Sequence, residues 1–247
     1  MEALMPSLLA AALIALLAML VRGVTGFGAA LVMSPLLLLF FDVHTAVVAS
    51  AAVQIVTGFG IAWHARFALD RAYLKVMLPA GVIGIIAGTL VLVAVDGNVL
   101  KRLLGSVTML FALRSMWGLR SNAPPAGAWP RWTGAIAGGL SGFLGSIFGT
   151  SGPPVVIYLN NQALGKAAMR ATLLMYFLAI DSTRMAGYLW SGLLTRDVIV
   201  LGLVMLPGAI VGGWLGTHLH LQIGERTFRW GVAGLLFVTG ALLLING

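Results

Sequence analysis

The chain has 247 residues, of which 60% are hydrophobic and 9% are charged, and its formal net charge at pH 7 is +8. An ordinary soluble domain carries roughly 25% charged residues, so this composition excludes a soluble globular protein and predicts an integral membrane protein. The lack of cysteine excludes disulfides and thiolate chemistry. The basic excess is spread over short loops, which is typical of membrane proteins and does not indicate nucleic-acid binding.

The apolar stretches of the chain predict about seven to ten helical segments. In chain order they span residues 4–21, 26–41, 44–63, 74–95, 99–118, 132–147, 153–160, 168–190, 197–219 and 227–245. A transmembrane β-strand would alternate between apolar and polar residues, whereas these stretches are apolar on every face. Several of them are too short to cross a bilayer alone. We therefore expect an all-α fold, a single transmembrane domain over residues 1–247, in which some helices are broken or re-entrant.

Two glycine-rich breaks interrupt the apolar pattern, GVTGFGAALVMSP at residues 23–35 and SGFLGSIFGTSGPP at residues 141–154. In hydrocarbon, backbone groups freed from a helix are tolerated only where they are buried in protein or line a cavity. A helix N-terminus that points inward attracts anions, and proline is common at the first positions of a helix. The breaks therefore predict a substrate site, with tight turns between antiparallel helices as the alternative. The residues expected to bind substrate there are Thr25, Gly26, Gly28, Gly149, Thr150, Ser151 and Gly152.

The two halves of the chain are similar in sequence. Residues 76–90, VMLPAGVIGIIAGTL, align without gaps to residues 204–218, VMLPGAIVGGWLGTH. This predicts two repeats, at residues 1–119 and 131–247, joined by a loop at residues 120–130. The glycines shared by the two segments, Gly84, Gly88, Gly212 and Gly216, predict close helix packing, because small residues let helix backbones approach in lipid.

The register between the two breaks has two solutions. Aligning Pro35 with Pro154 pairs Gly26 with Gly145, whereas the later segments favour a register that places Gly26 near Gly149. The sequence alone leaves both open.

The loop charges predict that the two repeats are inverted. Basic residues mark the cytoplasmic side of a membrane protein, which places the loop with Arg66, Arg71 and Lys75 inside. The corresponding loop of the second half, near Asp197, then lies outside. Inverted repeats with interrupted helices are typical of secondary transporters, whose substrate site lies near the bilayer midplane.

Two charged residues, Asp181 and Arg184, lie about ten residues from either end of an otherwise apolar segment. Charges near the bilayer centre cost roughly 2.5 to 3.5 kcal/mol each and mark function by default. Spacing of three places both on one helical face. A structural ion pair is one explanation. The other is that Arg184 binds an anion and Asp181 positions it or carries a coupling proton, with Gln54 lining the same cavity.

The chain resembles the sulfite exporter TauE/SafE family, also called the toluene sulfonate uptake permease family. The resemblance rests on RGVTGFGAALVMSPLL at residues 22–37 and GGLSGFLGSIFGTSGPPVVIYL at residues 138–159. It implies a multi-pass transporter of the bacterial-type inner membrane that moves sulfite, sulfonates, sulfoacetate or organic acids. Where many members carry three glycines, this chain has GTSG.

Together these observations predict a secondary transporter of small anions and not an enzyme. An anion channel is one alternative. A rhomboid-like intramembrane serine protease is the other, because GLSG at residues 139–142 could supply Ser141 as nucleophile and His218 as base. The expected partners are a small anion, the lipid bilayer and a coupling proton or sodium ion, with a homodimer left open. We expect no cofactor, no metal site and no nucleic-acid partner.

Overall fold

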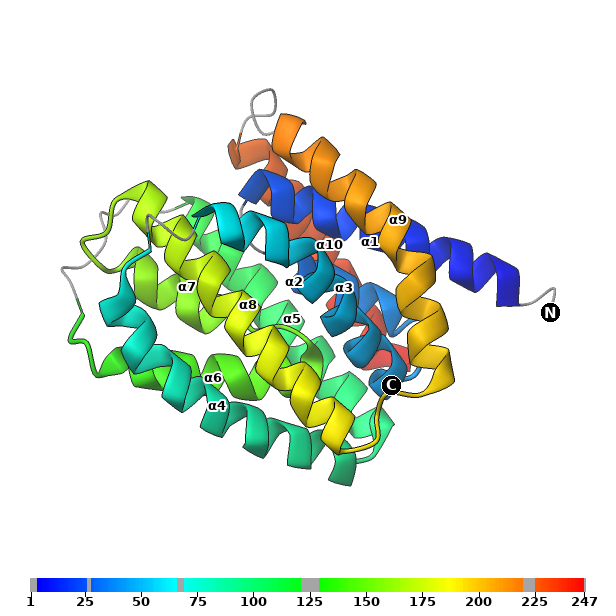
Figure 1. Cartoon of the computed structure of the whole chain (residues 1–247). Helices are drawn as coiled ribbons and strands as arrows, with labels where there is room; N and C mark the ends of the chain where they lie inside the picture. Colours follow the sequence, from blue (N-terminus) through cyan, green and yellow to red (C-terminus); the bar gives the residue numbers. More distant parts are fainter. Residues whose placement is uncertain (1–3, 26–27, 66–68, 121–128, 220–224, 247) are drawn as a thin grey trace. The chain divides into compact units, whose positions relative to one another are not determined.

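The computed structural model describes residues 4–25, 28–65, 69–120, 129–219 and 225–246, and in these ranges it is built of ten α-helices (Figure 1). The helices are α1 (Leu4–Thr25), α2 (Ala29–Leu37), α3 (Val43–Ala65), α4 (Arg71–Ala94), α5 (Gly97–Arg120), α6 (Thr133–Phe148), α7 (Gly152–Asn160), α8 (Lys166–Trp190), α9 (Arg196–Leu219) and α10 (Glu225–Asn246). Each predicted apolar stretch corresponds to one helix. The all-α fold predicted from the sequence is therefore confirmed.

Three of these helices are long and apolar enough to cross a membrane over the described residues, at Met5–Gly23, Arg71–Ala94 and Arg196–Gly216. Shorter apolar helical segments occur at Val43–Phe59, Thr133–Phe148 and Trp230–Ile245. The short helices α2 and α7 have nine residues each. Such helices reach only part of the way across a bilayer, because a helix rises about 1.5 Å per residue.

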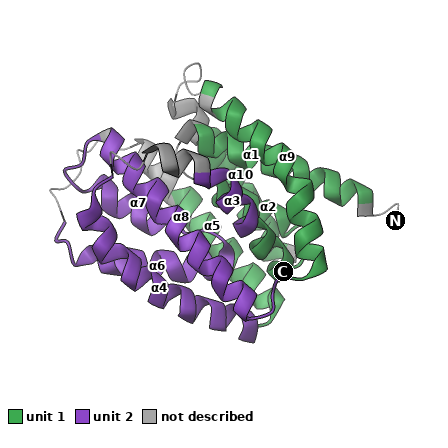
Figure 2. Ribbon diagram, viewed as in Figure 1, with its two compact units in different colours: residues 1–50, 95–123, 195–247 green, residues 51–94, 124–194 purple. Residues whose placement is uncertain are grey.

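The chain forms two compact units, coloured separately in Figure 2. Unit 1 comprises residues 1–50, 95–123 and 195–247, and unit 2 comprises residues 51–94 and 124–194. These units do not coincide with the two halves of the sequence. Helix α4 of the first half belongs to unit 2, and α9 and α10 of the second half belong to unit 1.

In unit 2, α4 and α6 pack through their glycines. Gly138 lies against the carbonyl of Met77, and Gly142 lies against the carbonyl of Gly81. Further along, a Cβ built at Gly88 would approach the carbonyl oxygen of Phe143 to 2.6 Å. The numbers of the contacting residues rise together along both helices, so α4 and α6 run parallel. Their backbones approach so closely that no side chain fits at these glycine positions.

Unit 1 repeats this kind of packing between α1 and α9. Gly212 of α9 lies against the carbonyl of Leu16, and Gly216 lies against that of Leu20. Together with Gly84 and Gly88 in unit 2, these are the four glycines for which the sequence predicts close helix packing. The structure confirms that role.

Basic residues gather at one end of unit 2. Helix α8 runs parallel to α6, because Tyr176 reaches the carbonyl of Gly138 and, further along, Tyr188 reaches that of Ser146. The starts of α4, α6 and α8 therefore share one end of the unit. Exposed basic side chains occur there at Arg71, Lys75, Arg131 and Arg170. This arrangement agrees with the cytoplasmic side predicted for these three helix starts.

Candidate functional site

The break between α6 and α7 is built on backbone geometry that suits glycine. Helix α6 ends at Phe148, and Gly149 follows with φ of 75°, a left-handed conformation that costs glycine no side-chain clash. The N–H of Gly149 donates to the carbonyl of Gly145 at 2.8 Å and closes the last turn. Thr150 and Ser151 are both buried in the break. Buried polar side chains thus lie where the helix is interrupted.

The start of α7 offers fewer amide donors than the sequence suggests. Pro153 and Pro154 occupy its first turn, as predicted, and proline has no N–H. The amide of Gly152 precedes them, and no side chain caps the helix. Ser141 of α6 holds the break closed, because its hydroxyl donates to the carbonyl of Ser151. An anion at this helix end would therefore be bound by few backbone amides.

The first-half break lies in unit 1. Thr25 is the last residue of α1, and Gly28 precedes α2 with φ of 93°. Gly26 lies outside the described residues. Positive φ at Gly28 and at Gly149 gives each break a glycine that another residue would strain.

The helix boundaries favour one of the two registers between the breaks. Helices α2 and α7 have equal lengths, and aligning them end to end also aligns the last residues of α1 and α6 and the first residues of α3 and α8. This alignment pairs Gly26 with Gly149. In the same register, the residues that Gly84 and Gly88 pack against in unit 2 correspond to those that Gly212 and Gly216 pack against in unit 1.

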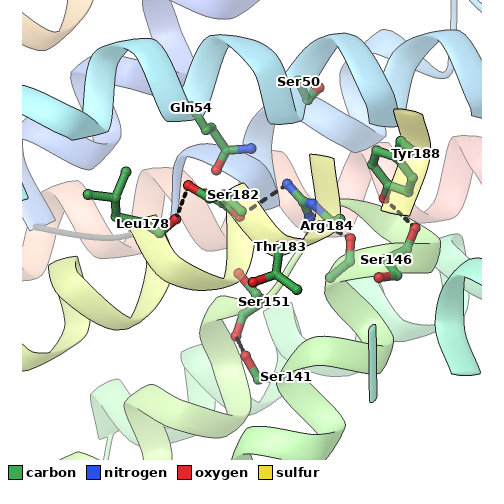
Figure 3. Close-up of polar contacts among 12 residues, drawn as sticks. Ser50, Gln54, Ser141, Ser146, Ser151, Leu178, Ser182, Thr183, Arg184 and Tyr188 are labelled. Atoms are coloured by element: carbon green, nitrogen blue, oxygen red, sulfur yellow. Dashed lines mark hydrogen bonds and ion pairs between the residues drawn. The ribbon is translucent and has the colours of Figure 1, made fainter. Parts of the chain in front are cut away.

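Arg184 and Asp181 form a buried ion pair on α8. The Nη2 atom of Arg184 lies 3.2 Å from Oδ1 of Asp181, and the Arg184 side chain is fully buried. Its Nη1 donates to the carbonyl of Gly145 at 2.5 Å (Figure 3). That carbonyl lies at the C-terminal end of α6, where the helix dipole is negative and favours a cation. Arg184 therefore joins α8 to the helix that leads into the break.

One edge of the Arg184 guanidinium makes no hydrogen bond with the described residues. Its Nε and Nη2 are buried donors without an acceptor in hydrogen-bond geometry, although Nη2 is within ion-pair distance of Asp181. A buried donor left unsatisfied costs about 1–3 kcal/mol, and more when it is charged. Two adjacent N–H groups on a planar fork match the oxygens of a carboxylate, sulfonate or phosphate. The arrangement can bind an oxyanion side-on.

Two tyrosines on α8 fix its position against α6. Tyr188 donates to the carbonyl of Ser146 at 2.6 Å, and its ring lies 6.0 Å from Cζ of Arg184. Tyr176 donates to the carbonyl of Gly138 at 3.1 Å, two turns earlier on α6. Tyr176 thus makes the same kind of contact as Tyr188 but further from the guanidinium.

Because Tyr188 lies near the Arg184 guanidinium and Tyr176 does not, removing the two hydroxyls should have different effects on anion binding. Tyr188→Phe and Tyr176→Phe should each lower the free energy of unfolding by about 1 kcal/mol, because each loses one hydrogen bond. Only Tyr188→Phe should also weaken anion binding, since it loosens the turn that holds Arg184. Thermal unfolding and anion titrations of the two purified variants check this. Equal anion affinities in the two variants would contradict it.

The remaining polar candidates differ in their contacts. Gln54 is buried, and Figure 3 shows its amide turned toward the part of α8 that carries Ser182 and Arg184. The hydroxyls of Ser182 and Thr183 donate to carbonyls one turn earlier in α8. Thr57 does the same within α3. These three hydroxyls therefore donate to carbonyls of their own helices.

Several buried polar residues were not predicted as candidates, among them Arg22, Thr89, Ser146 and Tyr188. Tyr188 continues the helical face of Asp181 and Arg184, so helical spacing could have found it. Ser146 lies within the quoted break sequence. Arg22 is basic in the last turn of α1, where the helix dipole favours a cation.

The chemistry of the described residues does not favour an enzyme site. The hydroxyl of Ser141 is buried and engaged with the Ser151 carbonyl. His218 is exposed and bonds the carbonyl of Trp214 in its own helix. Neither contact resembles a nucleophile paired with its base. Across the described part of the chain, no cluster of three or more histidine, cysteine or acidic residues could hold a metal ion.

The chain is similar in sequence to known transport proteins. The model of the family described as Sulfite exporter TauE/SafE matches residues 11–243. The chain is 26% identical over 169 residues to the "Probable sulfite/organosulfonate exporter TauE" of Cupriavidus necator. It is 30% identical over 168 residues to the "Probable inner membrane transporter protein TsaS" of Comamonas testosteroni.

These similarities cover part of each protein. Both alignments take in 68% of this chain, with 64% of the Cupriavidus protein and 69% of the Comamonas protein. The chain thus spans slightly less than two thirds of the first relative and slightly more than two thirds of the second. No solved structure matches the chain.

Proposed function

The chain belongs to the sulfite exporter TauE/SafE family of membrane transporters, and we propose that it moves small oxyanions, sulfite or organosulfonates among them, across a bacterial inner membrane. The observation that carries the proposal is the buried edge of Arg184, whose Nε and Nη2 make no hydrogen bond with the described residues. The names of the two relatives, an exporter of sulfite or organosulfonate and an inner membrane transporter, support the substrate class and the membrane. Neither name is that of an enzyme.

The binding step uses the guanidinium as a fork. Nη1 of Arg184 stays on the carbonyl of Gly145, which fixes the plane of the group. The N–H groups of Nε and Nη2 then donate to two oxygens of the anion. Asp181, 3.2 Å from Nη2, is the group that the anion competes with.

Charge balance gives Asp181 its role in coupling. Without substrate, Arg184 and Asp181 sum to zero charge. An anion alone would leave the buried site with a net negative charge, which is costly in a low-dielectric interior. A proton taken up by Asp181 keeps the occupied site neutral and frees Nη2 for the anion. We therefore propose that a proton travels with each monovalent anion.

The surroundings of Asp181 leave it as the group that takes up this proton. Asp181 shares its helix with Tyr176 and Tyr188, whose hydroxyls donate to carbonyls of α6. In the described part of α4, α6 and α7, the charged or titratable side chains are Arg71, Tyr73, Lys75 and Tyr158. Those of α4 lie at the start of that helix, and Tyr158 donates toward the carbonyl of Arg131.

Replacing Asp181 with asparagine tests the coupling. The variant keeps a side chain of similar shape but cannot take up a proton. We expect it to exchange anion across the membrane but to lose accumulation driven by a pH gradient. Uptake of labelled anion into proteoliposomes, with and without an imposed gradient, measures both properties. Gradient-driven accumulation at the wild-type level in Asp181→Asn would contradict proton coupling through this residue.

The other predicted site residues complete the proposal. Gly149, Thr150, Ser151 and Gly152 lie in the break that follows Arg184's carbonyl partner, and Gln54 points toward α8. The first-half residues Thr25, Gly26 and Gly28 stay predictions, as do the inverted repeats and a homodimer. Alternating access would use the two helix breaks, since interrupted helices in related halves are typical of secondary transporters.

Ligand-induced stabilisation tests the substrate class. A ligand that binds only the folded state stabilises it by about 2.7 kcal/mol at one hundred times its dissociation constant. We expect sulfite, methanesulfonate or sulfoacetate to raise the unfolding temperature of the detergent-purified protein, with chloride as the control for ionic strength. If none of these anions stabilises the protein and none enters proteoliposomes, the proposed function is wrong.

A further inference from the structure

Two buried hydroxyls in unit 2 make no hydrogen bond with the described residues. They are Oγ of Ser146 in α6 and Oγ1 of Thr89 in α4, and both side chains are buried. Helical serine and threonine commonly donate to a carbonyl one turn earlier. The hydroxyls of Ser50, Thr57, Thr172, Ser182 and Thr183 do so in this structure. Ser146 and Thr89 depart from that pattern.

Both hydroxyl-bearing residues lie at the level of Arg184. Ser146 directly follows Gly145, whose carbonyl holds Arg184, and the Ser146 carbonyl accepts the hydroxyl of Tyr188 (Figure 3). A Cβ built at Gly187, on the next turn of α8 after Arg184, would lie 3.5 Å from Oγ1 of Thr89. The two residues therefore flank the part of α8 that carries the guanidinium.

Helices α4, α6 and α8, which carry Thr89, Ser146 and Arg184, pack against one another near these three residues. A Cβ built at Gly88, which precedes Thr89, would lie 2.8 Å from the Cβ of Ser146. Helices α4, α6 and α8 thus meet where three buried groups lack hydrogen-bond partners: Thr89 Oγ1, Ser146 Oγ and the Nε and Nη2 edge of Arg184. An unsatisfied polar group is costly in a membrane interior. Three buried groups without hydrogen-bond partners where α4, α6 and α8 meet indicate that a ligand binds there.

We infer that Ser146 and Thr89 are specificity-determining residues that bind the third oxygen of a sulfonate-type anion at the junction of α4, α6 and α8. The inference rests on the proposed function. A carboxylate has two oxygens, and the Nε and Nη2 groups of Arg184 can donate to both of them. A sulfite or sulfonate group has three oxygens in a pyramid, so one of them projects out of the guanidinium plane. The hydroxyls of Thr89 on α4 and Ser146 on α6 both donate to that oxygen.

Selectivity between two monovalent anions tests this assignment. Methanesulfonate and acetate have similar size and equal charge at pH 7, and they differ in the third oxygen. We expect the wild-type protein to prefer methanesulfonate. Ser146→Ala and Thr89→Val should each lower methanesulfonate affinity about tenfold, the effect of one hydrogen bond to a charged group, and leave acetate affinity within about twofold. Isothermal titration of the full-length protein in detergent measures these affinities.

The unfolding temperature without anion and the anion preference of control variants together distinguish a binding role of the two hydroxyls from a structural one. Because neither hydroxyl makes a hydrogen bond with the described residues, Ser146→Ala and Thr89→Val should unfold at the wild-type temperature or above it in the absence of anion. The matched controls are Ser182→Ala and Thr183→Val, whose hydroxyls bond carbonyls within α8. The controls should keep the wild-type preference for methanesulfonate.

The outcomes distinguish this inference from the proposed function. Wild-type selectivity in both hydroxyl variants would overturn the inference and leave water as the partner of these groups. An equal loss of affinity for both anions would also overturn it, because the hydroxyls would then only position Arg184. If the wild-type protein bound neither anion, or if Arg184→Lys bound methanesulfonate at full strength, the proposed function itself would fail.

Discussion

Replacing Arg184 with alanine is expected to abolish anion binding and anion transport. The substitution removes the buried fork whose Nε and Nη2 edge lacks a hydrogen-bond partner among the described residues. Two hydrogen bonds to a charged group correspond to a loss of affinity of at least about a hundredfold. Arg184→Lys should lose most of this affinity as well, because an ammonium group keeps the charge but not the planar pair of donors. Titration with methanesulfonate and uptake into proteoliposomes measure both effects.

Controls separate the loss of the site from the loss of the fold. Arg170→Ala removes an exposed arginine from the same helix and should leave binding unchanged. Arg184→Ala leaves the buried carboxylate of Asp181 without its cation, and breaking a buried pair costs about 3–5 kcal/mol. The double variant Asp181→Asn/Arg184→Gln avoids that cost and should fold but not bind. Transport by the double variant at the level of Arg170→Ala would show that Arg184 does not bind the anion.

Replacing Gly142 with alanine is expected to destabilise unit 2 strongly. A Cβ at this position would overlap the carbonyl group and the Cα of Gly81 on α4. Backbone atoms cannot rotate away as a side chain can, so the two helices must separate. We expect a loss on the order of 3 kcal/mol, which lowers the unfolding temperature by roughly 6–12 °C in a chain of this size.

Gly139 provides the matched control on the same helix. A Cβ at Gly139 would lie 3.6 Å from the carbonyl oxygen of Ala80, an ordinary contact distance. Gly139→Ala should therefore be neutral, or slightly stabilising through better helix propensity. Thermal unfolding of both variants, followed by tryptophan fluorescence, gives the comparison. Similar unfolding temperatures for Gly142→Ala and Gly139→Ala would contradict the close packing of α4 on α6.

The sequence predicted the helices well because their signal is local. Each apolar stretch is bounded by polar, glycine or proline residues, and these features end helices wherever the chain goes afterwards. The ion pair of Asp181 and Arg184 was predictable for the same reason, since residues three apart share one helical face. The prolines at the start of α7 likewise indicated where a new helix begins.

Which helices pack against one another, and which groups bond between them, could not be predicted from local sequence. The glycine faces of α4, α6 and α9 look alike in sequence, and nothing within one helix says which other helix will cover its glycine face. The carbonyl of Gly145 as the acceptor for Arg184 depends on α8 lying against α6. Whether a helical hydroxyl bonds within its own helix, as Ser182 does, or lacks a protein partner, as Ser146 does, depends on neighbouring helices.

The pairing of α1 with α9 has a consequence for how the protein is made. Helix α1 leaves the ribosome before the other nine described helices, and the glycines that pack against it, Gly208, Gly212 and Gly216, come about 190 residues later in the chain. During synthesis the face of α1 that α9 covers therefore stays without this partner until the chain has been made as far as Gly216. Unit 2 can close earlier, because α4, α6 and α8 follow one another within residues 71–190. We therefore expect unit 2 to assemble before unit 1, and a chain that stops before α9 to leave α1 without the helix that packs on it.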